Sequence, residues 1–420
     1  MRHCKPKKRT RETGSRRWAS VGAAALVTLS AAACSTPTTV PQGTATSSAP
    51  ASQTSSQSRQ TPSAPAGNRH GTPWTLALNT TVPAAGTADP PIAYATVRGA
   101  TVYAVDYIDS RVYALDAATG AQRWRSASVA LDTEAAAPAA LDGNAVYLQG
   151  LTQVIALNAA DGTVEWTASA GPPPLTAPVA ADGVVYVGGE QSGQVLALDG
   201  ATGKRKWQFN DAASAAGPVT AADGTLFLPD QSGKVYALNA ATGSQKWVFD
   251  SRGADTAEPT GQSQIDSQPT VVGGVVYAAS YAGMVFAIDE STGKLKWSFH
   301  TPGPIDSHPA VANGTVFIGA GDSKVYALNS ATGKQEWTFQ TGSGGVYSSP
   351  LAVNGVVYVG SNDGRIYALD AASGQRKWAF ATGGDIYESS PVLAGGLLVI
   401  GSQDGKLYAL DAATGTAASR

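Results

Sequence analysis

The chain has 420 residues, 43% of them hydrophobic, and its 29 Lys/Arg and 31 Asp/Glu give a formal net charge of −2 at pH 7. Eight of the basic residues lie in residues 1–17 beside Glu12, so the remainder carries 21 basic against 30 acidic residues, a formal charge of −9. This negative charge argues against nucleic acid or anionic lipid headgroups as main partners. Cys4 and Cys34 are the only cysteines, which excludes disulfide and thiol chemistry from residues 35–420.

Residues 1–33 predict a signal peptide for export. A basic segment is followed by residues 18–33, WASVGAAALVTLSAAA, which are apolar or small throughout. This stretch is too short and too rich in alanine for a membrane span, but it suits a cleaved signal. Arg16-Arg17 matches a twin-arginine signal only in part, because Ala19 stands where an aromatic residue or Leu is preferred. The choice between the Sec and Tat routes stays open.

Cys34 follows Ala31-Ala32-Ala33, and two interpretations stay open. Acylation of Cys34 would make it the N-terminus of a lipoprotein, although Ala31 stands where a lipobox usually has Leu. Cleavage after Ala33 would instead release an unanchored protein. The next segment favours lipidation, because residues 34–73 consist mainly of Ser, Thr, Pro, Ala, Gln and Gly. Such a segment buries too little apolar surface to fold, and we predict a disordered tether with a root-mean-square reach of roughly 35 Å.

From residue 74 the sequence repeats with a period near 41 residues, and the clearest copy is VYALNSATGKQEWTF at residues 325–339. Its apolar start predicts a buried strand, its Asn-Ser-Ala-Thr-Gly a turn, and its Trp-containing end a returning strand. Two more strands precede each copy, and Asn354-Gly355 between two such strands is typical of a tight hairpin. The turn glycines recur at Gly120, Gly162, Gly203, Gly243, Gly293, Gly333, Gly374 and Gly415. Eight units of four strands indicate a β-propeller.

The tryptophans predict how the ring closes. Seven of them stand four residues after a turn glycine, but after Gly415 this position is Ser419 and the chain ends at Arg420. Trp74, just before the first unit, is the one tryptophan left outside the leader. We therefore predict an all-β fold over residues 74–420: an eight-bladed propeller of four-stranded antiparallel blades, with the last blade closed by the N-terminal strand around Trp74. The predicted blade-docking residues are Trp74, Trp124, Trp166, Trp207, Trp247, Trp297, Trp337 and Trp378.

The repeated Ala-Leu-Asp-x-x-Thr-Gly-x-x-x-Trp resembles the tryptophan-docking repeat of the PQQ-dependent alcohol dehydrogenases and of their non-enzymatic relatives. BamB, a lipoprotein of outer-membrane β-barrel assembly, typifies these relatives. The resemblance covers roughly residues 74–420 and implies a PQQ-like repeat propeller. A fold of this kind does not select an activity.

The resemblance leaves a quinoprotein oxidoreductase, with PQQ in the central funnel, as the alternative function. Enzymes of this class carry a disulfide between adjacent cysteines over the cofactor, which residues 35–420 cannot form, and their catalytic aspartate and calcium ligands match no motif here. His300 and His308 do not suffice for a three-histidine metal site. Asp363-Gly364 and Asp404-Gly405 lack the alternating acidic positions of calcium loops and predict hairpin turns. We expect no catalytic residue, no metal and no cofactor.

Each predicted blade begins near a proline, and the residues before it should enter the innermost strand at the funnel mouth. These residues are small in the early blades, as at 135–137 and 215–217, but polar in the last four blades. The only long insertion, residues 251–264, precedes blade 5 on the same side. The polar side chains could simply bond the inner-strand backbone and solvate a channel. The sharper hypothesis is a ligand or peptide site built by Asp266, Asp306, His308, Tyr347, Tyr387 and Glu388.

These observations predict a lipid-anchored propeller on the extracytoplasmic face of a bacterial membrane. We expect a monomeric, non-catalytic scaffold whose partners are cell-envelope proteins or peptides that meet its loops and strand edges. The resemblance to BamB makes envelope assembly the nearest role, in an organism that has an outer membrane.

Overall fold

The computed structural model describes residues 71–77, 94–107, 109–131, 137–190, 192–210, 217–253 and 264–417. The predicted signal peptide, Cys34 and most of the predicted tether lie outside these residues, as does most of the insertion before blade 5. Within the described ranges the only helical element is a short 3-10 turn, η1 (Ser251–Gly253).

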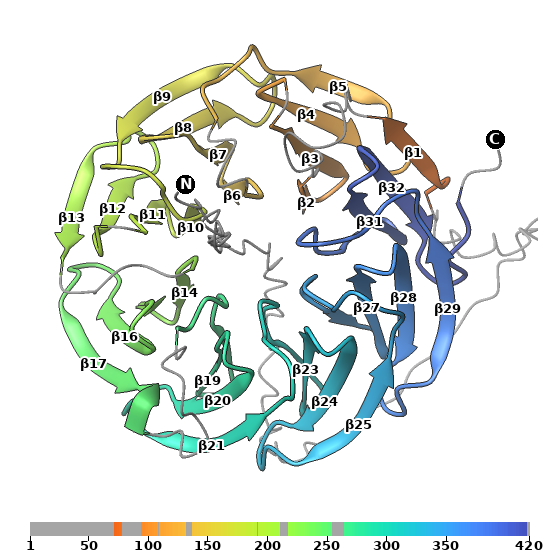
Figure 1. The fold of residues 1–420 in the computed structure, drawn as a ribbon. Helices are drawn as coiled ribbons and strands as arrows, with labels where there is room; N and C mark the ends of the chain where they lie inside the picture. Colours follow the sequence, from red (N-terminus) through yellow and green to blue (C-terminus); the bar gives the residue numbers. More distant parts are fainter. Residues whose placement is uncertain are drawn as a thin grey trace, which may run out of the picture. The chain divides into compact units, whose positions relative to one another are not determined.

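Eight antiparallel sheets of four strands each form a closed ring (Figure 1). In blades 1 to 7 the strands follow chain order from the centre to the circumference, as β2, β6 and β10 at the centre and β9, β13 and β17 at the circumference illustrate. The strands of the first four blades are β2 (Tyr94–Arg98), β3 (Thr101–Asp106), β4 (Arg111–Asp116) and β5 (Gln122–Arg125); β6 (Ala140–Asp142), β7 (Ala145–Gln149), β8 (Gln153–Asn158) and β9 (Val164–Ser169); β10 (Val179–Ala181), β11 (Val184–Gly188), β12 (Val195–Asp199) and β13 (Arg205–Phe209); and β14 (Thr220–Ala222), β15 (Thr225–Pro229), β16 (Lys234–Asn239) and β17 (Gln245–Asp250).

The remaining four blades repeat this order, except that blade 8 takes its outer strand from the N-terminal side of the ring. Their strands are β18 (Thr270–Val272), β19 (Val275–Ala279), β20 (Met284–Asp289) and β21 (Leu295–His300); β22 (Ala310–Ala312), β23 (Thr315–Ala320), β24 (Lys324–Asn329) and β25 (Gln335–Gln340); β26 (Leu351–Val353), β27 (Val356–Ser361), β28 (Arg365–Asp370) and β29 (Arg376–Ala381); and β30 (Val392–Ala394), β31 (Leu397–Ser402) and β32 (Lys406–Asp411), with β1 (Trp74–Ala77) outermost.

The hydrophobic core lies between neighbouring blades. The Val-Tyr-Ala-Leu segment of each third strand is buried on both faces, as in β24, where Val325, Ala327 and Leu328 are fully buried. Clusters of buried side chains join each pair of blades, so every sheet is covered on both sides. Apolar side chains that alternate to both faces of a short strand explain why the repeat reads as almost continuously hydrophobic there.

The turn after each third strand is held by its own side chains, as the sequence predicted. In blade 6, Asn329 Oδ1 accepts hydrogen bonds from the backbone N–H and the hydroxyl of Thr332, and the N–H of Gly333 donates to the Asn329 carbonyl at 2.8 Å. Gly333 has a φ of +70°, which glycine adopts without strain. The Asn354-Gly355 hairpin likewise has positive φ at both residues, as a type I′ turn requires.

Each tryptophan ring packs on the turn glycine of the next blade. A methyl group added at that glycine would lie 2.5–2.7 Å from the indole in all eight turns, so only glycine fits. Each indole N–H donates to a backbone carbonyl of the same turn, at 2.8–3.0 Å. The pairs are Trp74–Gly120, Trp124–Gly162, Trp166–Gly203, Trp207–Gly243, Trp247–Gly293, Trp297–Gly333, Trp337–Gly374 and Trp378–Gly415.

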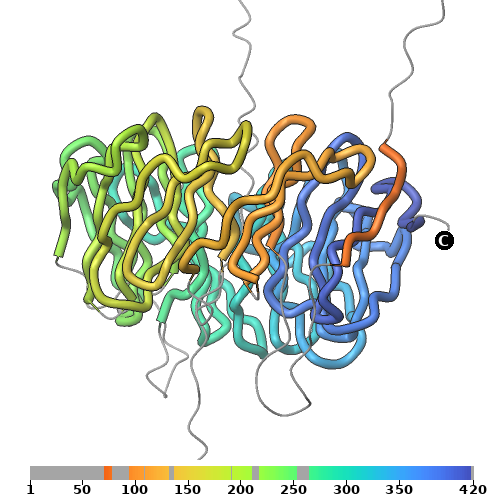
Figure 2. Tube along the Cα trace, turned by 90° about the horizontal axis from the view of Figure 1, so that it is seen from above, coloured from red at the N-terminus to blue at the C-terminus, as the bar shows by residue number. Residues whose placement is uncertain are grey.

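The ring closes through the N-terminal strand. β1 pairs antiparallel with β32, with Trp74 opposite Ala409, and Figure 2 shows this first strand beside the C-terminal blade. Trp74 is buried and donates to the Ala117 carbonyl of blade 1, so a single residue links blades 8 and 1. Just before it, the N–H groups of Gly71 and Thr72 donate to the carbonyls of Gly395 and Ala118. The predicted all-β, eight-bladed propeller with an N-terminal closing strand is confirmed.

Candidate functional site

The two faces of the ring carry different kinds of connection. Because the strands of a blade alternate in direction, the turns after the first and third strands lie on one face. The turns after the second strand and the loops between blades lie on the opposite face, where each inner strand begins. We call this second face the mouth face. The predicted site residues Asp266, Asp306, Tyr347, Tyr387 and Glu388 all precede inner strands on it.

In blades 5 to 8 a serine stands two residues before the inner-strand proline and forms hydrogen bonds within its own blade. The N–H of Gly319 donates to Ser307 Oγ at 2.9 Å and the Ser307 hydroxyl donates to the Gly319 carbonyl at 2.8 Å. The same position is occupied by Ser267, Ser348 and Ser389, which accept from the N–H groups of Ala279, Gly360 and Gly401. These serines therefore bond the backbone of their own blade. This is the structural role that the sequence analysis gave as the alternative to a binding site.

The residues that directly precede the prolines connect neighbouring blades. The N–H of His308 donates to Ser349 Oγ at 2.9 Å, and the N–H of Ser349 donates to Ser390 Oγ at 3.0 Å. The Gln268 side chain donates to the Val219 carbonyl of blade 4 at 2.8 Å. A series of hydrogen bonds thus runs from blade to blade around the inner strands and fixes the loops that carry the site residues.

His308 lies in this wall and is only 3% exposed. Neither ring nitrogen has a hydrogen-bond partner within the described part of the chain. Burial lowers the pKa of His308 to about 3, so the imidazole is neutral at physiological pH. His308 is close in sequence to Asp306, another predicted site residue. Its side chain nevertheless lies below the surface, where a large ligand cannot contact it.

Two carboxylates from neighbouring blades, Asp266 and Asp306, interact electrostatically on the mouth face. Burial and the negative charge of Asp266 raise the pKa of Asp306 to about 7. Asp266 accepts a hydrogen bond from the Gln264 amide at 2.7 Å, whereas the carboxylate of Asp306 accepts none from a described residue. The pair joins blades 5 and 6 in one negatively charged group.

Asp306 interacts electrostatically with three tyrosines, Tyr281, Tyr347 and Tyr387. Tyr281 comes from the turn between β19 and β20, and Tyr347 and Tyr387 come from the loops before β26 and β30. Burial, followed by nearby carboxylates that include Asp306, raises the pKa of each hydroxyl. The rings of Tyr347 and Tyr387 lie 5.2 Å apart between centroids at an interplanar angle of 57°. These side chains extend the group across blades 7 and 8.

Glu388, in the loop before β30, links these residues to blade 1. Its Oε2 accepts a hydrogen bond from the Tyr94 hydroxyl at 3.0 Å, and Tyr94 in turn packs edge-on against Tyr107 with centroids 6.2 Å apart. Burial and Glu388 raise the pKa of Tyr94 well above its usual value. We define the mouth cluster as Asp266, Tyr281, Asp306, Tyr347, Tyr387, Glu388 and Tyr94, from blades 5, 6, 7, 8 and 1.

The sequence hypothesis identified five members of the mouth cluster and missed Tyr281 and Tyr94. Tyr281 had a signal, because Gln231 occupies the same turn position in blade 4, so an aromatic side chain there departs from the repeat. Tyr94 gave no such signal. The loops before the inner strands of blades 2 to 4 have Ala137, Leu175 and Gly217 among their described residues, whereas the turns between the second and third strands of blades 3 and 4 carry Glu190 and Asp230.

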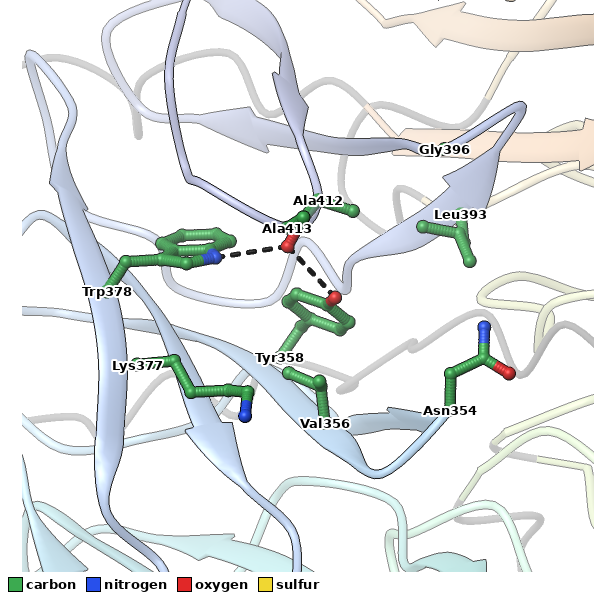
Figure 3. A pocket seen from close by; sticks show the side chains of 9 residues that line it. All are labelled: Asn354, Val356, Tyr358, Lys377, Trp378, Leu393, Gly396, Ala412 and Ala413. Atoms are coloured by element: carbon green, nitrogen blue, oxygen red, sulfur yellow. Dashed lines mark hydrogen bonds between the residues drawn. The ribbon is translucent and has the colours of Figure 1, made fainter. Parts of the chain in front are cut away.

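A separate cavity of about 310 Å³ lies on the opposite face, in the seam between blades 7 and 8 (Figure 3). The Trp378 indole and the Tyr358 hydroxyl both donate to the Ala412 carbonyl at 3.0 Å, and Leu393 and Lys377 also line the space. Because Trp378 and Tyr358 already hold the two blades together, this cavity belongs to the docking machinery of the ring.

Across the described ranges, no group of three or more His, Cys, Asp or Glu side chains is arranged to hold a metal ion. Among the described residues, no helix has the length and apolar character needed to span a membrane.

An eight-bladed propeller with tryptophan-docked blades defines the class of PQQ-like repeat proteins. Residues 108–302 and 282–419 match the family described as outer membrane protein assembly factor BamB, and the chain belongs to this family.

Two solved structures have a similar fold, and one further protein is similar in sequence over part of its length. BamB from Moraxella catarrhalis has a similar structure, with a TM-score of 0.63 and 20% identity over 81% of this chain and 99% of that one. Quinohemoprotein alcohol dehydrogenase from Comamonas testosteroni gives a TM-score of 0.65 and 17% identity over 83% and 77% of the two chains. The serine/threonine-protein kinase AfsK of Streptomyces griseus is 34% identical over 140 residues, 31% of this chain but only 17% of the kinase.

Proposed function

We propose that this chain is an exported, lipid-anchored and non-catalytic scaffold that binds segments of other cell-envelope proteins at its mouth cluster. The BamB family supports an association with the envelope. Lipidation of Cys34 and a tether formed by residues 34–73 would hold the ring at the extracytoplasmic face of a membrane.

The observation that carries the proposal is the mouth cluster itself. Five consecutive blades place carboxylates and tyrosines at one end of the ring, although the strands and turns around them follow the repeat. Tyrosine provides a large contact area with little loss of side-chain freedom, and it is enriched at protein-binding surfaces. Inter-blade hydrogen bonds such as His308 to Ser349 keep the loops in place, so little order has to be gained on binding.

The first experiment is cross-linking in the native envelope. A photo-reactive amino acid at position 347 should capture a defined envelope protein, identified by mass spectrometry. The same probe at position 295, an exposed leucine on outer strand β21, is the matched control and should not capture that protein. Equal capture at both positions, or none at position 347, would contradict binding at the mouth cluster.

The anchor is tested separately. Wild-type protein should sediment with membranes and incorporate labelled fatty acid, whereas Cys34→Ser should do neither and should appear in the soluble extracytoplasmic fraction. Sedimentation of Cys34→Ser to the same extent as wild type would show that another element holds the protein to the membrane.

The non-catalytic part of the proposal is tested with purified protein and added PQQ and Ca²⁺. We expect neither a stoichiometric quinone absorption band nor dye-linked alcohol oxidation. Appearance of both would replace the scaffold by a quinoprotein oxidoreductase, the fold of which is shared.

A further inference from the structure

We propose that the cavity in the seam between blades 7 and 8 binds a small aromatic carboxylic acid, whose ring lies between the two blades and whose carboxylate meets the ammonium group of Lys377. The docking residues Trp378 and Tyr358 form one side of this cavity, and the space beside them is open to a ligand (Figure 3). Because the cavity lies on the face opposite the mouth cluster, this inference goes beyond the proposed scaffold function and does not depend on it.

The cavity is apolar inside and polar at its rim. Tyr358 is buried, Val356 of blade 7 and Leu393 of blade 8 are half-buried, and Asn354 and Lys377 are exposed. The volume of about 310 Å³ is near the lower end of the range for ligand pockets, roughly 300–1,000 Å³. An apolar cavity of about 150 Å³ already holds benzene, so one ring with a short substituent fits here.

The rings of Tyr358 and Trp378 favour an aromatic ligand over an aliphatic one. Their centroids lie 5.9 Å apart at an interplanar angle of 44°. The Tyr358 hydroxyl and the Trp378 indole N–H both donate to the Ala412 carbonyl, so these two protons are already used. The ring surfaces remain for a ligand, and a third ring packed edge-on or offset against them gains more than area burial alone provides.

Blade 7 lacks a contact that other blades make at this place. In blades 1, 4 and 6, the residue before the docking tryptophan shares a hydrogen bond with a threonine that begins the second strand. These pairs are Arg123–Thr101 at 2.8 Å, Lys246–Thr225 at 2.6 Å and Glu336–Thr315 at 2.9 Å. The corresponding residues of blade 7 are Lys377 and Val356, and the valine side chain has no group that could form this bond. The space that the other blades bridge is therefore left to a ligand.

Lys377 supplies the charge at the rim. The pairing of β28 with β29 shifts at Ala368–Leu369 and leaves Lys377 without an opposite residue, and such a bulge re-aims a side chain. Of the nine described residues that line the cavity, Lys377 is the one that carries a charge. Its Nζ lies 3.3 Å from Asp370 Oδ2, in an exposed pair of the kind that adds little to stability. The ammonium can therefore turn to a ligand carboxylate, and the Asn354 amide provides a second donor at the rim.

The test is calorimetric titration of the mature full-length protein with phenylacetate and with phenylacetamide, which has the same ring but no charge. Phenylacetate should bind at least five times more tightly than phenylacetamide. Lys377→Gln should weaken phenylacetate binding at least fivefold and leave phenylacetamide binding within twofold. The matched control, Arg376→Gln, removes the same charge from the preceding exposed residue and should leave both affinities within twofold. Equal binding of the two probes, or an equal loss in both variants, would overturn the site.

Two further variants use residues that stand at the same places in other blades, so the fold tolerates them. Val356→Thr introduces the threonine of blades 1, 4 and 6 and should weaken phenylacetate binding at least threefold, because Lys377 regains a partner across the space. Asp370→Asn introduces the turn residue of blade 6, Asn329, and should strengthen binding at least twofold, because it removes the competing carboxylate. Unchanged affinity in both variants would rule out Lys377 as the carboxylate partner.

Two more probes define the class of ligand. Cyclohexylacetate has the same carboxylate without an aromatic ring and should bind at least three times more weakly than phenylacetate; equal affinity would overturn the preference for a ring. Acetyl-Ala-Ala-Phe with a free C-terminus carries the same two groups on a peptide. Binding of phenylacetate without binding of the peptide assigns the site to a free aromatic acid, whereas tighter binding of the peptide would overturn the small molecule as the source.

Discussion

Blades 5 to 8 and blades 2 to 4 share a four-stranded topology and the docked turn after the third strand, but they differ where their inner strands begin. Asp266, Asp306, Tyr347 and Glu388 occupy this position in blades 5 to 8, whereas Leu175 occupies it in blade 3 and is fully buried. Residues that recur in every unit hold the ring together, and residues that differ between units distinguish its two halves. The residue before the inner strand can therefore differ between blades without disturbing the docking tryptophans and turn glycines, because the two sets of residues make different contacts.

The largest expected effect breaks the shared part of the ring. Trp337 is 9% exposed, packs against Phe317 at 5.7 Å between centroids and donates to the Ala371 carbonyl. Trp337→Ala should lower the free energy of unfolding by about 3–5 kcal/mol, measured by urea denaturation. Under conditions where the variant is folded, capture of the envelope protein from position 347 should be unchanged. A loss below about 1 kcal/mol would show that the tryptophan does not dock the blades.

The second prediction concerns the polar half of the ring and its pH dependence. The pKa of Asp306 is raised on folding, so its contribution to stability is full below about pH 4 and is lost as the pH rises through 7. The pKa of His308 is lowered to about 3, so its contribution is present above pH 6.5 and is lost as the pH falls. Between pH 4 and 6.5 the two effects oppose each other.

Single variants should reveal the two opposing slopes. Relative to wild type, Asp306→Asn should become more stable by on the order of 3 kcal/mol as the pH rises from 4 to 7. His308→Gln should shift in the opposite direction over the same range. Urea midpoints at several pH values provide the measurement. Parallel curves for wild type and Asp306→Asn would show that Asp306 ionises normally in the folded state.

The last prediction concerns the repeat and compares two glycine variants, whose difference in stability loss is the smallest of the expected effects. Gly374 and Gly355 both lie in blade 7 with φ values of +70° and +74°, but only Gly374 faces an indole, that of Trp337. Gly355→Ala should cost about 1 kcal/mol, the strain of a left-handed residue. Gly374→Ala should cost about 1–3 kcal/mol more, because the added methyl displaces Trp337. Equal losses in thermal or urea unfolding would mean that the glycine is needed for its backbone conformation alone.

The sequence was enough to predict the ring, because each blade repeats the same local chemistry. The turn glycines set the period, and the missing tryptophan after Gly415 together with the extra Trp74 predicted the closing strand, which the structure confirms. Local patterns of this kind need no knowledge of distant contacts.

The mouth cluster was only partly predictable, since its members come from different units and from two kinds of loop. Counting back from the prolines found Asp306 and Tyr347 but not Tyr281, which reaches the same place from the turn between β19 and β20. The same count placed His308 at the mouth, whereas alternation along the chain and the bond from its N–H to Ser349 position it in the wall. Which side chain of a loop reaches the surface depends on backbone geometry that spacing alone does not give.

The pairing of β1 with β32 has a consequence for the order of folding. Trp74 is made early during synthesis, yet its partner Ala409 lies more than three hundred residues further along the chain. Until that partner emerges, the last sheet lacks its outer strand and the first blade lacks its neighbour. The molecule therefore becomes a continuous ring only in its final folding step, when its beginning meets its end.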